Sequence, residues 1–180
     1  MTLTMRDLEP FCSTDPKRGI LRAPWSKDGF TYSANGYIIV RVTRLPDAAE
    51  PENPPGAAQI FELTAGQDVA PLPALELPAP RTRECQHCDG RGTQHDCPTC
   101  DCACASCGGT GTHCEYASVG LRGTPFATRY IELILRLPGA AFSTTPPPRD
   151  PARFVFAGGE GALMPLNSRY EHHLEVAEGQ

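Results

Sequence analysis

Alternating apolar and polar positions predict strands in the first flank of the chain. Residues 37–44 (Tyr-Ile-Ile-Val-Arg-Val-Thr-Arg) end in clean alternation, which predicts a strand with one buried face and Arg41 on the other. Two shorter β segments, 20–26 and 30–33, precede it. Asp28-Gly29 and Asn35-Gly36 separate the three segments, and such dipeptides favour tight hairpin turns. With an extended start and a short helix over 5–12, the first flank is predicted to be β-α-β-β-β.

The second flank repeats this order. Residues 117–121 can form a strand, and Thr124-Pro125 predicts a helix N-cap followed by proline at the first helical position. An apolar stripe at helical spacing follows, and Pro138-Gly139 closes it. The stripe comprises Phe126, Tyr130, Leu133, Ile134 and Leu137. Three more strands are predicted at 141–144, 153–157 and 162–166, with Gly158–Gly161 as a turn. The expected fold class is α+β, one domain of two β-α-β-β-β halves.

A proline-rich stretch separates the halves. Eight prolines lie between Pro46 and Pro80. Because proline removes a ladder donor and fixes φ, we expect an extended connector, in which only residues 59–63 could pair as a short strand.

Cysteines dominate the sequence after the connector. Eight of the nine lie between Cys85 and Cys114, and two copies of CxxCxGxG begin at Cys85 and Cys104. Each CxxC pair can donate two thiolates to one metal, and the glycines permit the tight backbone turn that such a knuckle needs. Cys85, Cys88, Cys104 and Cys107 therefore predict a closed tetrahedral Zn²⁺ site of structural type.

The residues between the two copies predict a second zinc. Its candidate ligands are Cys97, Cys100, Cys102 and His95, with His113 or Cys114 as alternatives to His95. The other interpretation is that Cys97 and Cys100 replace one of the outer pairs and leave spare thiols.

Three other uses of the cysteines fit less well. Disulfides need an oxidising compartment, yet the chain opens on Met-Thr-Leu-Thr-Met-Arg-Asp, which is not a signal peptide. The duplicated spacing is less typical of an iron–sulfur cluster. A redox CxxC normally stands alone beside a βαβ pattern. Zinc is the preferred assignment, and a cytoplasmic location is expected.

Composition and charge narrow the function. The net charge is −5, with 16 basic and 21 acidic residues in 180, so no chain-wide phosphate-binding surface is indicated. No apolar run reaches the roughly 20 residues that span a bilayer. No catalytic motif is recognisable, and a closed zinc site cannot activate water. We expect a protein that is not an enzyme, with no membrane association and no small-molecule substrate.

The two CxxCxGxG copies resemble the cysteine-rich region of DnaJ-type chaperones, which has four such repeats and two zincs. In that family the first and fourth repeats share one metal. The resemblance therefore implies that the two copies here, with Cys85, Cys88, Cys104 and Cys107, share one metal. It covers about 30 residues, and no His-Pro-Asp tripeptide of a J-domain occurs in the chain.

The flanks resemble one domain of the DNA sliding clamps, which also consists of two β-α-β-β-β halves. The similar segments are residues 27–40, with the Asp-Gly turn, residues 129–137 (Arg-Tyr-Ile-Glu-Leu-Ile-Leu-Arg-Leu), and residues 162–166 (Ala-Leu-Met-Pro-Leu). A clamp ring contains six such domains, so a chain with one would have to form a hexamer or join another ring to encircle DNA.

These features together predict the domain organisation. The first half of the clamp-like domain is expected at 1–45, the connector at 46–82, an inserted zinc module at 83–115, the second half at 116–168 and a tail at 169–180. The expected function is that of a phage-type accessory protein of replication or repair, which acts by binding a protein partner, DNA or both. Arg81, Arg83 and Arg91 are the candidate contacts, and oligomerisation is possible. The alternative is a protein-binding adaptor or inhibitor, a clamp mimic or anti-defence protein, that captures a polypeptide with the zinc module.

Overall fold

The computed structural model describes residues 3–72, 75–78, 81–93, 102–115 and 117–166, with only the backbone at 114 and 115. These residues form two compact units. Unit 1 contains residues 1–77 and 118–180, and unit 2 contains residues 78–117. Each unit is described by itself. Within the described residues, no helix has the length and apolarity that crossing a membrane requires.

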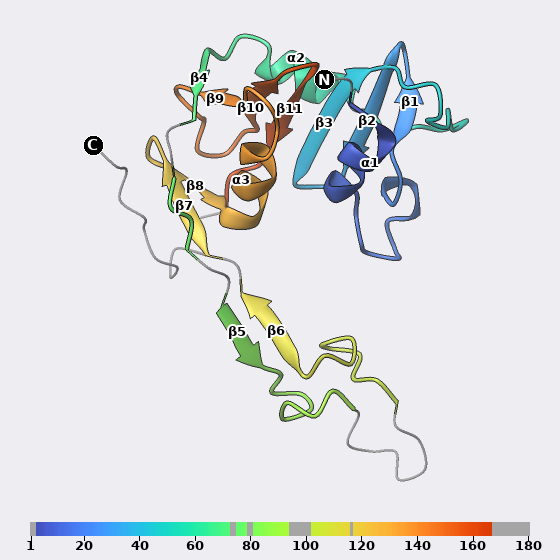
Figure 1. Ribbon diagram of the computed structural model, residues 1–180, viewed down its shortest axis with the longest axis vertical. Helices are drawn as coiled ribbons and strands as arrows, with labels where there is room; N and C mark the ends of the chain where they lie inside the picture. The colour runs from blue at the N-terminus through green and yellow to red at the C-terminus, as the bar shows by residue number, and fades with distance from the viewer. Residues whose placement is uncertain (1–2, 73–74, 79–80, 94–101, 116, 167–180) are drawn as a thin grey trace. The chain divides into compact units, whose positions relative to one another are not determined.

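Unit 1 is built on an antiparallel sheet of seven strands in the order β1-β2-β3-β11-β10-β9-β4 (Figure 1). The strands are β1 (Trp25–Lys27), β2 (Phe30–Ala34), β3 (Ile38–Thr43), β4 (Val69–Pro71), β9 (Ala141–Ser143), β10 (Ala152–Phe156) and β11 (Gly159–Leu163). A two-stranded hairpin of β7 (Ser118–Leu121) and β8 (Thr124–Ala127) accompanies the sheet. The coarse fold class, α+β with a large antiparallel sheet, is therefore confirmed.

The sheet is assembled from two meanders. β1-β2-β3 follows the short helix α1 (Met5–Leu8) and two 3₁₀ turns, η1 (Glu9–Phe11) and η2 (Gly19–Leu21). β9-β10-β11 follows α3 (Thr128–Leu135). β3 pairs with β11 and joins the meanders. Of the segment expected to begin the first half in extended form, the described residues Leu3 and Thr4 form no strand, and Thr4 caps α1.

Each face of the sheet covers a separate core. Ile38, Val40 and Val42 of β3 point into the larger core, where they join α1, α3, the β7–β8 hairpin and the phenylalanines of β9 and β10. Ile39 points to the other face, into a smaller core with Trp25, Tyr32 and Phe61. The predicted alternation of β3 is thus present, and both of its faces are covered.

Residues 59–63, expected to form a short strand, are instead part of helix α2 (Ala58–Thr64). Burial is the physical reason, because the helix buries Phe61 and Thr64, and Phe61 belongs to the smaller core. The connector is also less extended than its composition suggests, since β4 pairs with β9 and becomes the last strand of the sheet. Pro71 is acceptable there because an edge strand leaves one side of its backbone unpaired.

The expected helix start at Thr124-Pro125 is wrong, because these residues begin β8. Arg122 and Gly123, with φ of 52° and 83°, form the two-residue turn between β7 and β8. This conformation is typical of a type I′ hairpin turn. Helix α3 starts three residues later than predicted, at Thr128, with Ala127 as its N-cap.

The predicted turn at Gly158–Gly161 is also shorter than expected. β11 begins at Gly159, opposite Phe156, so only Ala157 and Gly158 turn. The strand ends at Leu163 rather than 166. Glycine at 161 is required sterically, because a Cβ there would overlap the ring of Phe154 and the carbonyl of Ile39.

Candidate metal centre

Unit 2 consists of a two-stranded ribbon and two cysteine knuckles. β5 (Arg81–Glu84) pairs with β6 (Thr112–Glu115), and each strand is adjacent to one knuckle (Figure 1). Cys85 follows β5 directly, and Gly111, the last residue of the second CxxCxGxG, precedes β6. The ribbon therefore brings together two knuckles that are 19 residues apart in sequence.

The two knuckles bond to each other reciprocally. The Cys85 N–H donates to the Gly111 carbonyl at 2.8 Å, and the Cys104 N–H donates to the Gly92 carbonyl at 2.7 Å. Within each knuckle the first glycine donates back to the carbonyl of the first cysteine, Gly90 to Cys85 at 3.1 Å and Gly109 to Cys104 at 3.3 Å. Equivalent positions thus make equivalent bonds, as in two copies related by an approximate twofold axis.

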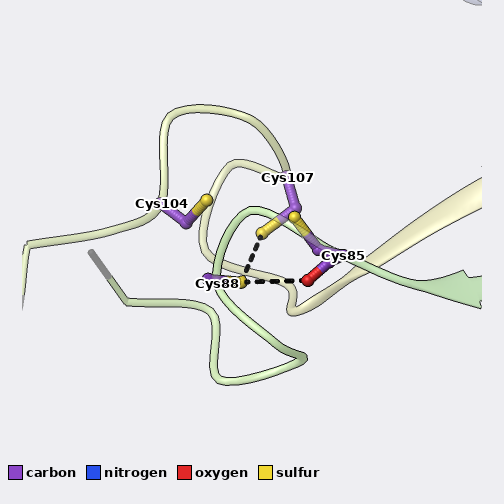
Figure 2. Close-up of side chains that lie close together, drawn as sticks. All are labelled: Cys85, Cys88, Cys104 and Cys107. Atoms are coloured by element: carbon purple, nitrogen blue, oxygen red, sulfur yellow. Dashed lines mark hydrogen bonds between the residues drawn. The ribbon is translucent and has the colours of Figure 1, made fainter. Parts of the chain in front are cut away.

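Four sulfur atoms meet where the knuckles face each other. The Sγ atoms of Cys85, Cys88, Cys104 and Cys107 all lie within 4.8 Å of one another and are buried (Figure 2). The Cys88 and Cys107 sulfurs are 3.8 Å apart. None of the cysteines whose side chains are described forms a disulfide. Four thiols converging on one point form a donor set that can hold a metal ion.

Backbone N–H groups point at two of these sulfurs. The N–H of Gly92 donates to Cys88 Sγ and that of Gly111 to Cys107 Sγ, each at 3.3 Å. Such bonds stabilise a thiolate and orient it toward the metal. The donor in each case is the final glycine of CxxCxGxG, a role that residue type alone did not indicate.

The glycines are needed for their conformation and for space. Gly92 and Gly111 have φ of 75° and 73°, in the left-handed region that disfavours a side chain. A Cβ on Gly92 would overlap the Gly109 carbonyl, and one on Gly111 would overlap the Gly90 carbonyl. The duplicated glycines allow the two backbones to pass close to each other, which brings the sulfurs together.

Within the sulfur cluster, the thiols of Cys88 and Cys107 have pKa values shifted in opposite directions. Burial raises the pKa of Cys88 to about 11, and neighbouring thiols add to this rise against the Gly92 N–H. Burial also opposes ionisation of Cys107, but the N–H groups of Gly111 and Gly109 and the neighbouring thiols outweigh it and lower the pKa to about 6. One thiol of the pair therefore ionises readily while the other retains its proton. A bound divalent cation would displace the remaining protons.

The candidate second site is not assembled within the described residues. His95, Cys97 and Cys100 lie outside them, and only the backbone of Cys114 is described. Cys102 is exposed and His113 is partly exposed, with Nε2 3.4 Å from Ser106 Oγ. The second zinc stays a prediction.

The three candidate contact arginines have different surroundings. Arg91 pairs with Asp89 at 3.6 Å and donates from Nε to the Cys88 carbonyl at 3.1 Å, so it supports the first knuckle. Arg81 and Arg83 are exposed on β5. Arg83 lies opposite His113 of β6 and lines a depression with residues of both knuckles.

Comparison of the chain with protein-family models, curated proteins and solved structures finds no match. The class of protein is therefore defined by its own fold and site. It is an α+β protein with four buried cysteines positioned to hold a metal ion, a donor set consistent with zinc.

Proposed function

We propose that this chain is a non-catalytic, zinc-binding accessory protein of DNA transactions, of a phage type, that acts by binding. The convergence of four buried sulfurs within 4.8 Å carries the first part of this proposal. Four protein ligands complete a tetrahedral shell and leave no position for water or substrate. A zinc ion held by these four cysteines would have a structural role, because it would crosslink two knuckles that bury little else.

The role in DNA transactions is supported by the resemblance of the flanks to a sliding-clamp domain. Two meanders, each preceded by a helix, join through their last strands β3 and β11, which is compatible with a duplicated origin of unit 1. Strong duplex binding by the helices is not favoured, because Arg136 pairs with Glu132 at 2.5 Å on α3.

Metal analysis of the purified full chain tests the metal assignment. One zinc per chain supports the four-cysteine site, and two support the additional site. If the metal-free chain folds and shows the same hydrogen-exchange protection in unit 2 as the metal-bound chain, the metal assignment is wrong.

Association and DNA binding test the wider function. The zinc-loaded chain is examined by sedimentation and by titration with fluorescent duplex DNA at low and high salt. A ring-sized oligomer, or affinity that falls as salt rises, supports the DNA-transaction function. A monomer indifferent to DNA at both salt concentrations contradicts it.

A second candidate function is that of a protein-binding adaptor, and an apolar pocket in unit 1 favours it. The pocket lies beside α2 and the sheet, and its lining includes Trp25, Ile39, Ile60, Tyr37 and Met164. Tyr37 is 51 % exposed and Met164 38 %, which is unusual for large apolar side chains beside a pocket. A polypeptide that buries apolar side chains there would protect the pocket from hydrogen exchange, whereas DNA would not.

A further inference from the structure

Unit 2 has a depression that the metal centre does not use. It measures about 330 Å³, and it is lined by Arg83, Gln86, His87, Ser106 and His113. All five side chains carry at least one hydrogen-bond donor, and none of these lining residues is acidic.

The metal knuckles position most of this lining. Gln86 and His87 are the two residues between Cys85 and Cys88, and Ser106 lies between Cys104 and Cys107. Arg83 and His113 are directly opposite each other on β5 and β6. Each lining residue is therefore fixed by a knuckle or by the ribbon adjoining it, so the depression depends on the metal for its shape.

The donor set fits an oxyanion. The planar guanidinium of Arg83 presents paired N–H groups that match phosphate geometry. An imidazole donates at least one N–H in either protonation state, so His87 and His113 contribute without a requirement for charge. Gln86 supplies a neutral amide donor at the same depression. Ser106 Oγ lies 3.4 Å from His113 Nε2, and whichever of the two donates in that contact, the pair keeps one N–H or O–H for a ligand.

The charge around the depression restricts the size of the anion. Residues 78–117 contain three arginines and no lysine, against the five acidic residues Glu84, Asp89, Asp96, Asp101 and Glu115. By composition these residues carry more acidic than basic side chains, so the unit as a whole does not favour a long polyanion. A compact anion that enters the depression meets side chains that can each donate a hydrogen bond, and none of the lining residues carries a negative charge. A phosphate monoester is such a ligand, because it carries a charge of about −1.5 to −2 at pH 7 and three strong acceptor oxygens.

We propose that this depression binds a phosphate monoester, presented as the 5′-terminal phosphate of a DNA strand. The nucleic-acid source rests on the proposed function, whereas the phosphate chemistry rests on the lining residues. A strand end fits the surface better than a strand middle, since only one phosphate group has to approach the acidic unit.

The test uses the zinc-loaded full chain in two arms. In the first, inorganic phosphate is titrated while the ¹H–¹⁵N resonances of residues 83–113 are followed. In the second, an oligothymidylate with a 5′-phosphate is compared with the same strand ending in a 5′-hydroxyl and with a phosphoserine peptide. Arg83→Gln is the test variant. Arg81→Gln is the matched control, because it removes the same charge from the same strand, and Arg81 does not line the depression.

We expect the 5′-phosphate to strengthen binding about tenfold and Arg83→Gln to remove this gain, as loss of a charge-assisted hydrogen bond predicts. Arg81→Gln should leave the gain within about twofold. Ser106→Ala, which does not change the charge, should weaken phosphate binding by a smaller factor of about three to five.

The outcomes separate this inference from the proposed function. If phosphate shifts no resonance at the depression while DNA still binds in a salt-dependent manner, the site is wrong and the proposed function stands. If phosphate binds through Arg83 but strands with and without 5′-phosphate bind equally, the nucleic-acid source is wrong. Preference for a phosphoserine peptide over the phosphorylated strand overturns that source in the same way.

Discussion

The interior of unit 1 consists of aliphatic and aromatic side chains, among them Phe126, Phe142 and Phe154, which have no exposed surface. The buried side chains of the described part of unit 2 are cysteines, packed with glycines where the two knuckles cross. Unit 1 can thus fold through removal of apolar surface from water, which does not depend on any ligand. Unit 2 buries too little for this, so its fold should follow the supply of metal. The two units should therefore unfold under different conditions: unit 2 when metal is removed, and unit 1 when its apolar core is disrupted.

Removing one metal ligand should have the largest effect. Cys88→Ser deletes a sulfur that receives the Gly92 N–H and lies 3.8 Å from the Cys107 sulfur. Structural zinc provides about 10–16 kcal/mol of apparent binding free energy in zinc-finger peptides, so loss of a ligand should unfold unit 2. Metal content per chain and hydrogen exchange of peptides from each unit measure the result.

Cys12→Ser is the matched control, because Cys12 lies in unit 1 with Sγ 3.1 Å from Ser33 Oγ. It should leave the metal content unchanged. Retention of a full metal complement by Cys88→Ser would show that the ligand set is wrong, and loss of protection throughout unit 1 would show that the units do not fold independently.

The converse experiment removes apolar volume from unit 1. Phe142 packs edge-to-face on Phe126, with ring centroids 5.2 Å apart, and both are fully buried. Phe142→Ala should destabilise unit 1 by about 3–5 kcal/mol, because the surrounding core cannot fill the cavity. The single tryptophan, Trp25, lies in unit 1, so its fluorescence during urea unfolding reports on that unit alone.

If the two units fold independently, Phe142→Ala should leave the metal content per chain unchanged. Leu63→Ala is the control, since Leu63 is 71 % exposed on α2 and should change stability by no more than about 0.5 kcal/mol. Zinc loss that accompanies unfolding of unit 1 would contradict the independence of unit 2.

Local signals in the sequence predicted part of this structure well. Asp28-Gly29 predicts a primed turn, and both residues have positive φ, 49° and 80°, between the paired strands β1 and β2. The alternation in residues 37–44 predicts β3. The duplicated CxxCxGxG identifies the four cysteines whose sulfurs lie together in the structure. In the turn and the strand, neighbouring residues determine the outcome, whereas each knuckle is local and the ribbon of β5 and β6 brings the two knuckles together.

Where pairing or packing against another segment decided the outcome, the sequence was misleading. Thr124-Pro125 has the residue types of a helix start, but pairing with β7 makes it a strand. The connector has the proline content of an extended segment, yet burial of Phe61 against Tyr32 favours a helix. The depression beside Arg83 was also missed, because its lining forms only when the knuckles and the ribbon fold together.

A smaller perturbation tests how closely the two knuckles must approach. A side chain at Gly92 would need a φ of 75° and would overlap the Gly109 carbonyl. The left-handed conformation alone costs a residue with a Cβ about 1–2 kcal/mol, and the overlap adds to this cost. Gly92→Ala should therefore lower zinc affinity about a hundredfold, corresponding to roughly 3 kcal/mol.

Gly108→Ala is the control that separates the cost of a positive φ from the cost of a steric overlap. Gly108 also has a positive φ, 62°, but nothing lies within 4 Å of a Cβ built there. Its loss of affinity in a chelator competition should be about tenfold or less. Equal losses for the two variants would show that the close approach of the knuckles is unimportant.

The smallest expected effect concerns a charge network of Arg41, Arg153 and Glu160 in unit 1. Glu160 of β11 accepts from Arg41 at 2.9 Å and from Arg153 at 3.1 Å. Burial by itself raises the pKa of Glu160, but hydrogen bonds and charges from Arg41 and Arg153 outweigh it, so the pKa lies below the ordinary value of 4.5. Arg153 also donates to the Ala65 carbonyl, which ties the end of α2 to the sheet.

A lowered carboxyl pKa stabilises the fold above the unfolded-state pKa, and this contribution is lost as pH falls through the lower folded-state value. Glu160→Gln should therefore cost unit 1 about 1–2 kcal/mol at pH 7 and reduce the loss of stability below about pH 4.5. Urea unfolding followed by Trp25 fluorescence from pH 7 to pH 3 measures this without interference from thiol protonation in unit 2. Glu62→Gln, at an exposed position on α2, is the control and should retain the acid dependence of the unaltered chain. If Glu160→Gln retains that dependence as well, the network does not stabilise unit 1, and hydrophobic burial alone distinguishes it from the metal-dependent unit 2.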